Sequence, residues 1–257
     1  MKAKWSIIPD INEIEKFVAL AEKYDAAFEY NDFFEPFVYE DRAEVERRIN
    51  LYKDLDRDRS ADTLHGVFYD ISVLSRDTVI RERSRDLVKA SLDAAMRLSC
   101  RGVVFHTGMV FGLETKQYID SWLEGTDEFL HELVPQYKGL EIYIENTFEK
   151  SPAILASLME RVSDLEDTGI CLDYAHAMLT CTEGEAWFLS LHDKIRHMHL
   201  NDHDLKADLH LATGDGKIDL AHFKYLTEKY DVTKPRILLE VNGYDKASRS
   251  LGYMDKI

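Results

Sequence analysis

Four strand-like apolar segments of this chain end in a side chain that can bind a metal ion. They are residues 103–106, ending in His106; 142–145, ending in Glu145; 170–173, ending in Asp173; and 237–240, ending in Glu240. An ionisable group at the end of an apolar run costs desolvation energy unless a partner compensates for it. The carboxyl ends of all strands meet at the mouth of a parallel β-barrel. The pattern therefore predicts a site for divalent cations.

Further candidate ligands lie at the ends of other strands and in the loops that follow them. The full set is His65, His106, Glu145, Asp173, His176, His199, Asp208, His210 and Glu240. A single histidine at a strand end is commonly a hydrogen-bonded core residue, and a single carboxylate such as Glu240 can pair with Arg236. Because strand side chains alternate, a residue at a strand end points inward when the residue two positions earlier does so too. Nine such residues at one mouth favour metal binding.

The segments that must position these residues show two alternating patterns of apolar residues, one typical of helices and one typical of strands. Apolar spacing of three and four, as in residues 119–133 and 154–165, predicts helices. Near-continuous apolar runs predict strands that are covered on both faces. Eight such runs lie near residues 5–8, 26–30, 63–68, 102–106, 140–146, 169–174, 195–200 and 236–242. With helices in the gaps, the last one short and after Gly243, the pattern predicts an α/β protein with one (β/α)8 TIM-barrel domain over residues 1–257. The active site is expected at the C-terminal mouth of the strands.

Composition restricts the partners and the compartment. The 48 acidic and 32 basic residues give a net charge of −16, which argues against binding to duplex DNA. The three cysteines, Cys100, Cys171 and Cys181, form no CxxC pair and leave an odd number, as expected in a reducing compartment. Cys171 is expected to pack in the core. No apolar run approaches the ~20 residues of a membrane span. We expect a cytoplasmic protein without membrane contact.

Taken in order, the motifs resemble a known family. They are F-His106-x-G, Glu145-Asn146, L-Asp173-x-x-His176, H-x-His199-L-N-D, Asp208-x-His210 and L-Glu240. This ordered set, which covers about residues 60–242, resembles the xylose-isomerase-like TIM barrels. Within that superfamily it is most similar to the branch of endonuclease IV and the sugar phosphate isomerase- and epimerase-like proteins.

The resemblance implies a multinuclear metal site with up to three zinc ions. Glu145 would bridge two ions; His65 and His106 would complete the first site, Asp173, His199 and Glu240 the second, and His176, Asp208 and His210 the third. Histidine and carboxylate ligands suit zinc, or manganese as the alternative, better than calcium.

Four neighbouring residues are the candidate substrate-binding groups. Phe68 and Tyr69 follow His65 closely and could form a stacking wall for a base or sugar, or pack on the barrel rim. Asn146 and Asp202 could orient ligands, or lie in solvated loops. His197, two residues before His199, is expected to be a core histidine.

Two chemistries use such a site. In the first, divalent cations assist the hydrolysis of a phosphoester. In the second, one cation bound by Glu145, Asp173, His199 and Glu240 assists the isomerisation or epimerisation of a sugar or sugar phosphate, with Glu145 and Glu240 as the acid/base pair.

The number of ligands favours the hydrolase. Three divalent ions and four carboxylates leave about +2, which attracts a phosphate, whereas one ion leaves about −2. The extra ligands His65, His106, Asp208 and His210 serve no purpose in the one-metal mechanism. We expect a small phosphorylated or carbohydrate substrate in preference to duplex DNA, with an abasic site in nucleic acid as the other candidate. A non-catalytic metal-binding protein would not need so complete a set.

Overall fold

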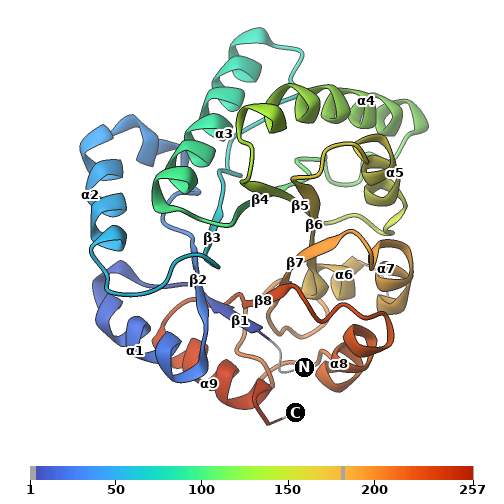
Figure 1. The fold of residues 1–257 in the computed structure, drawn as a ribbon. Coiled ribbons are helices and arrows are strands. Elements are labelled where there is room, and N and C mark those ends of the chain that lie inside the picture. The colour runs from blue at the N-terminus through green and yellow to red at the C-terminus, as the bar shows by residue number, and fades with distance from the viewer. Residues whose placement is uncertain (1–3, 181–182, 257) are drawn as a thin grey trace.

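Eight parallel strands close into a barrel that the helices surround (Figure 1). The structure is a computed structural model and describes residues 4–180 and 183–256. Each strand pairs with the next one in the chain, and β8 pairs with β1. The strands are β1 (Lys4–Ile7), β2 (Ala27–Tyr30), β3 (Thr63–His65), β4 (Gly102–His106), β5 (Glu141–Glu145), β6 (Thr168–Asp173), β7 (Ile195–Leu200) and β8 (Arg236–Leu239). The predicted fold class is confirmed.

The helices lie outside the barrel, between consecutive strands. They are α1 (Ile14–Tyr24), α2 (Arg42–Lys53), α3 (Thr78–Leu98), α4 (Lys116–Leu133), α5 (Ala153–Arg161), α6 (Tyr174–Thr180), α7 (Gly184–Leu191), α8 (Leu220–Lys229) and α9 (Tyr244–Met254). Short 3-10 helices are η1 (Ile11–Glu13), η2 (Pro36–Glu40) and η3 (Val134–Gln136).

The helix after Gly243 is longer than the sequence pattern suggested. α9 has 11 residues, because Ala247, Leu251 and Met254 form one buried face at helical spacing. The ring of Tyr244 meets that of Phe17 on α1 at 5.9 Å, so α9 closes the ring of helices against α1.

The third strand is shorter than the predicted run of residues 63–68. The strand ends at His65. The N–H of Gly66 still donates to the carbonyl of Val104 on β4 at 2.8 Å, and Gly66 lies against the ring of Phe105. A Cβ atom on Gly66 would lie 2.1 Å from Cε1 of that ring, so only glycine fits here. After Gly66, the N–H of Val67 donates to the hydroxyl of Ser91 on α3 at 3.2 Å, and Phe68 stacks on His106.

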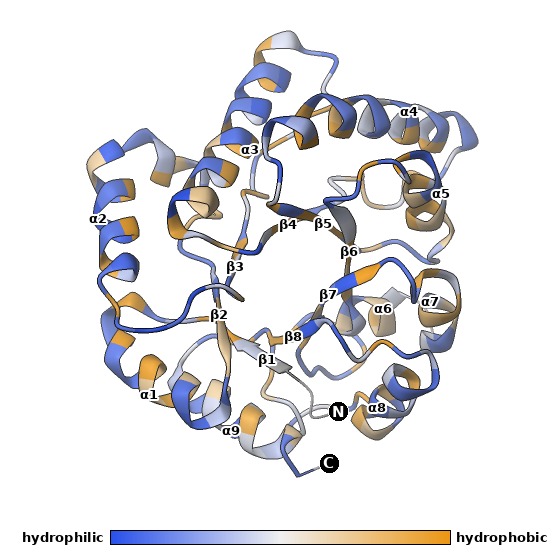
Figure 2. Ribbon diagram, in the orientation of Figure 1, coloured by the Kyte–Doolittle hydropathy of each residue, from blue (hydrophilic) through white to orange (hydrophobic). Residues whose placement is uncertain are grey.

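The main hydrophobic core fills the space between the barrel wall and the helices. Figure 2 shows helices with apolar residues toward the barrel and polar residues toward solvent. A second, small cluster consists of Val104, Tyr143 and Cys171, each two residues before a candidate ligand and so inside the barrel. Cys100 and Cys171 are buried free thiols, and Cys181 lies outside the described residues. In the part of the chain that the structure describes, no helix is long and apolar enough to cross a membrane.

The strand register brings the candidate ligands side by side. His106 on β4 pairs with Glu145 on β5, and Asp173 on β6 pairs with His199 on β7. All four lie at or near the carboxyl ends of their strands, at positions whose side chains point to the same side of the sheet. Their side chains therefore lie in one layer at the mouth of the barrel.

Candidate metal centre

The structure brings the nine candidate ligands together in three adjoining groups. Within each group, one ligand atom from each residue lies within 4.8 Å of the others. The first group is His65, His106 and Glu145; the second is Glu145, Asp173, His199 and Glu240; the third is His176, Asp208 and His210. This is the grouping that the resemblance implied, with Glu145 shared by the first two groups. That these residues bind metal remains a proposal.

Glu145 lies at the centre of the arrangement. Its Oε2 atom is 3.4 Å from Nε2 of His65 and 3.4 Å from Nε2 of His106. Its Oε1 atom is 3.2 Å from Nδ1 of His199. Two ligands that bind one tetrahedral zinc ion at about 2.0–2.1 Å are roughly 3.3–3.5 Å apart. The spacing around Glu145 is thus close to that of ligands around shared cations.

Three buried carboxylate oxygens of the second group lack a hydrogen-bond partner among the described residues. They are Oε2 of Glu145, Oδ2 of Asp173 and Oε2 of Glu240. Nearly all buried polar atoms in proteins have such a partner, because losing water without replacement is costly. Three orphaned anionic oxygens in one cluster fit a site that is built for cations.

The histidines are held in the tautomers that ligands need. In three of them Nδ1 faces a backbone carbonyl, which can only accept, so Nδ1 carries the proton of the neutral ring and Nε2 then has the free lone pair. The pairs are His65 with Gly66 at 3.0 Å, His176 with Asn146 at 3.0 Å, and His210 with Glu240 at 2.8 Å. These rings are oriented for coordination through Nε2.

The third group contains a strained backbone. His210 has φ 44°, a left-handed conformation that a non-glycine residue adopts at a cost of about 1–3 kcal/mol. The side chain of Lys246 donates to the carbonyl of His210 at 2.9 Å and helps to hold this conformation. The strain places Nε2 of His210 2.9 Å from Asp208, whose Oδ2 is also 3.3 Å from Nε2 of His176.

Electrostatics within the cluster are unbalanced in the absence of cations. Burial raises the pKa of Asp173 to about 7, and the charges of Glu240 and Glu145 act in the same direction, against the opposing effect of His176. Burial lowers the pKa of His106 to about 4, so this imidazole is neutral at pH 7 and ready to bind a metal. A divalent cation would relieve the repulsion among the three carboxylates.

Aromatic rings flank the centre on two sides. Phe68 stacks on His106 with ring centroids 4.5 Å apart, and on its other side it contacts Phe34 at 4.9 Å and Tyr69 at 4.2 Å. Tyr69 is half exposed. The sequence pattern did not single out Phe148, whose ring lies 6.1 Å from that of His176 and is exposed.

Asn146 and Asp202 make contacts that agree with the predicted role of orienting ligands, and their part in substrate binding stays a prediction. Both are 1% exposed, so they are not solvated loop residues. The Asn146 amide donates to the Asp173 carbonyl at 2.8 Å and accepts from the Asp173 N–H at 2.9 Å. Both oxygens of Asp202 accept backbone N–H groups, from His203, Gly214, Gly216 and Ile218. Each residue fixes a segment that carries candidate ligands.

Glu29 on β2 is a site residue that the sequence pattern missed. It is fully buried, and it lies 2.8 Å from Nε2 of His197 and 3.0 Å from Nε2 of His199. Burial raises the pKa of Glu29, but the two histidines bring it well below the usual value. A carboxylate within a strand that is covered on both faces was the available signal. His197 lies in the interior as expected, stacked on Tyr143.

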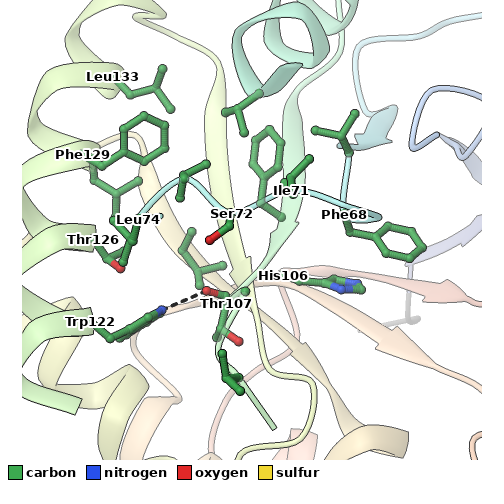
Figure 3. A pocket seen from close by; sticks show the side chains of 18 of the residues that line it. Phe68, Ile71, Ser72, Leu74, His106, Thr107, Trp122, Thr126, Phe129 and Leu133 are labelled. Atoms are coloured by element: carbon green, nitrogen blue, oxygen red, sulfur yellow. Dashed lines mark hydrogen bonds between the residues drawn. The ribbon is translucent and has the colours of Figure 1, made fainter. Parts of the chain in front are cut away.

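A cavity of about 270 Å³ lies beside the centre, between the barrel wall and α4 (Figure 3). Its lining is mainly apolar, with Trp122, Phe129 and Leu133 on α4, and of the nine candidate ligands only His106 borders it. The indole N–H of Trp122 donates to the carbonyl of Thr107 at 3.0 Å. α4 thus fixes the strand end that carries His106, and the cavity adds no ligand to the centre.

The sequence is similar to known proteins over most of its length. A model of the xylose isomerase-like TIM barrel family matches residues 18–257. A probable endonuclease 4 of Natronomonas pharaonis is 27% identical over 209 residues, which cover 72% of this chain and 73% of that protein.

Two solved structures share the fold over the whole chain. The TTHB071 protein from Thermus thermophilus, whose crystals were soaked with ZnCl2, superposes with a TM-score of 0.79 at 22% identity and covers 100% of this chain and 97% of its own. A D-tagatose 3-epimerase-like protein superposes with a TM-score of 0.76 at 21% identity, covering 100% and 96%. At these identities the likeness concerns the fold.

Proposed function

The chain belongs to the xylose isomerase-like TIM barrel family, and from this premise we propose that it is a metal-dependent phosphoester hydrolase. Its nine-residue centre would bind up to three divalent cations, with zinc favoured and manganese as the alternative. The substrate would be a small phosphorylated molecule, or an abasic site in nucleic acid. The family includes proteins named as endonucleases and as epimerases, so the reaction class is the point to decide.

The observation that carries the proposal is the completeness of the first and third groups. A one-cation enzyme needs only the four ligands of the second group. The first group adds His65 and His106 at contact distance from Glu145. The third group adds three further residues, one of them in a strained conformation. These features serve no purpose in a site for one ion.

The residues of the chain have separable roles in this reaction. Bound cations would activate a water molecule for attack on phosphorus and stabilise the charge on the phosphate oxygens. Glu145 would hold the first and second groups at a fixed separation through its two oxygens. Glu240, beside His199, would accept or return a proton at the open side of the second group. Phe68 and Phe148 would position the organic part of the substrate.

Charge favours an anionic substrate that is small. With Glu29 included, five carboxylates and three divalent ions leave the centre at about +1, which attracts a phosphate in a low-dielectric site. The chain as a whole carries −16, which repels an extended polyanion such as duplex DNA.

A second candidate is a one-metal sugar or sugar phosphate isomerase or epimerase. The observation in its favour is that the second group is by itself a four-ligand site that contains two carboxylates, Glu145 and Glu240, suited to move a proton. The likeness in fold to an epimerase-like protein agrees with this alternative.

Metal content and activity together test the proposal. The purified protein is loaded with zinc, the ions per chain are counted by elemental analysis, and activity is assayed on aryl phosphoesters, abasic duplex DNA and ketose sugars. About three ions and phosphoester cleavage are expected. One ion per chain with epimerisation of a ketose would refute hydrolysis and establish the alternative.

A double variant separates the two chemistries further. His65→Ala with His210→Ala removes one ligand from each outer group and leaves the second group intact. The hydrolase is expected to lose at least about 10²-fold in rate, whereas a one-metal isomerase would keep its activity. The matched control is His131→Ala with His222→Ala, which removes two histidines on the outer helices.

A further inference from the structure

Glu29 lies one residue layer below the candidate metal centre, inside the barrel. Its Oε1 atom is 3.0 Å from Nε2 of His199, without hydrogen-bond geometry, and neither atom has another hydrogen-bond partner among the described residues. On the opposite side of the same imidazole, Nδ1 is 3.2 Å from Glu145 and 3.5 Å from Glu240. His199 therefore connects Glu29 with the second group.

The Glu29 carboxylate is held in place by groups outside the metal centre. The hydroxyl of Thr63 donates to Oε2 at 2.6 Å, and Nε2 of His197 lies 2.8 Å from the same oxygen. The ring of Tyr143 stacks on His197 at 5.4 Å, with an interplanar angle of 17°. Because all these groups are buried, the carboxylate has little freedom to move.

His199 differs from the other histidines in the group that faces its non-coordinating nitrogen. In His65, His176 and His210 this nitrogen is Nδ1, and it faces a backbone carbonyl. In His199 it is Nε2, and it faces a buried carboxylate, which is a stronger acceptor. A carboxylate partner fixes the ring, sets the tautomer and makes the coordinating nitrogen more basic.

We propose that Glu29 is the positioning residue of the second group: when a cation is bound, its Oε1, which is close to Nε2 of His199 and has no other partner among the described residues, would accept the Nε2 proton and so reserve Nδ1 for the cation. Glu29 itself is not a ligand, since its two oxygens are directed to Thr63, His197 and His199. The inference rests on the proposed metal centre. It adds a functional residue on β2, a strand that supplies none of the nine ligands.

Zinc affinity tests the inference independently of activity. The variant is Glu29→Gln, which keeps the shape but removes the charge. The matched control is Asp62→Asn, since Asp62 is an equally buried carboxylate that bonds the N–H of Phe28 at 2.8 Å and the hydroxyl of Tyr30 at 2.6 Å on the same strand, away from the ligands. Zinc binding is measured by competition with a chromophoric chelator, and cobalt absorption spectra report the ligand geometry.

In Glu29→Gln, one ion is expected to bind about 10–100-fold more weakly and the cobalt spectrum to change. The control is expected to lose stability but bind zinc like the wild type. Wild-type zinc affinity in folded Glu29→Gln would overturn the inference alone, as would an equal loss in both variants. A wild-type protein that binds no zinc would overturn the proposed function as well.

A measurement on the unmodified protein covers the case in which Glu29→Gln does not fold. Long-range ¹⁵N–¹H correlation spectra of the zinc-loaded protein report which nitrogen of His199 carries its proton. A protonated Nε2 and a zinc-bound Nδ1 are expected. The opposite assignment would refute the role of Glu29.

Discussion

Replacing Asp173 by asparagine should stabilise the metal-free protein at neutral pH and weaken metal binding. The carboxylate of Asp173 is fully buried, and one of its oxygens has no hydrogen-bond partner among the described residues. Its surroundings include the charges of Glu145 and Glu240. Without cations the folded state therefore disfavours the ionised form, and asparagine removes the charge while keeping the size of the side chain.

The magnitude follows from the pKa. Burial together with the neighbouring carboxylates raises the pKa of Asp173 from 3.8 to about 7. For an acid with a raised pKa in the folded state, the stability contribution is complete below pH 3.8 and is lost as the pH rises through about 7. At 1.36 kcal/mol per unit, the loss is about 2 kcal/mol at pH 5 and about 4 kcal/mol at pH 8. Asp173→Asn should not show this loss.

Urea denaturation in the presence of a chelator measures the effect. At pH 8 the free energy of unfolding of Asp173→Asn should exceed that of the wild type, and the difference should shrink by about 2–3 kcal/mol at pH 5. With saturating zinc the order should reverse, because only the wild type gains the full binding energy. A variant that is less stable than the metal-free wild type at pH 8 would refute the reasoning.

Three further predictions concern the same cluster. Glu145→Gln should keep the fold by circular dichroism but lose activity and at least about 10³-fold in zinc affinity, since even two unit charges about 4 Å apart interact by about 4 kcal/mol at a dielectric constant near 20; an active variant would contradict this. Asp202→Asn should cost about 2–3 kcal/mol in urea denaturation, because one charge accepts four N–H groups, and should speed hydrogen exchange at Gly214 and Gly216. Burial alone would lower the pKa of His210, but Asp208 and Glu240 raise it to about 9. Burial would also lower the pKa of His176 in the same group, but Asp173 and Asp208 raise it. Zinc affinity of the third group should therefore rise at least about tenfold per pH unit between pH 7 and 9, and a flat profile in chelator competition would disprove competition with these protons.

The barrel could be predicted because its local signals agree. Apolar runs for buried strands alternate with helical spacing throughout, and no linker interrupts them. The errors lie at element ends, where a single contact decides. β3 ends at His65, and the glycine that follows it lies against Phe105, a proximity that depends on how β3 and β4 pair.

The grouping of the nine candidate ligands could be predicted because their chemistry and their position coincide. A histidine or carboxylate at the end of a buried strand has few other reasons to be there. The bonding partners of Asn146 and Asp202 could not be predicted from the sequence. Their side chains bond to backbone groups of other segments, and residue type does not reveal which N–H groups the fold will bring to them.

Glu29 was missed because the interior of a barrel is layered across strands. Its partners are His197 and His199 on β7, 168 and 170 positions later in the chain, and no local pattern links them. A residue in the middle of a predicted strand is expected to be covered by neighbouring side chains, so Glu29 gave no signal of a site. Only the closed barrel brings Glu29 on β2 next to the histidines of β7.

The interior of this barrel explains why metal binding and stability should be coupled. TIM barrels are typically filled by layers of branched apolar side chains. Here the separate apolar cluster inside the barrel contains only Val104, Tyr143 and Cys171, and the layer at the mouth consists of histidines and carboxylates. Such a layer cannot be satisfied by its own hydrogen bonds, since three of its oxygens have no partner within the described chain. Bound cations would then provide the missing partners of these oxygens. Removing a charge from the layer of candidate ligands should therefore weaken metal binding and activity while it stabilises the metal-free protein.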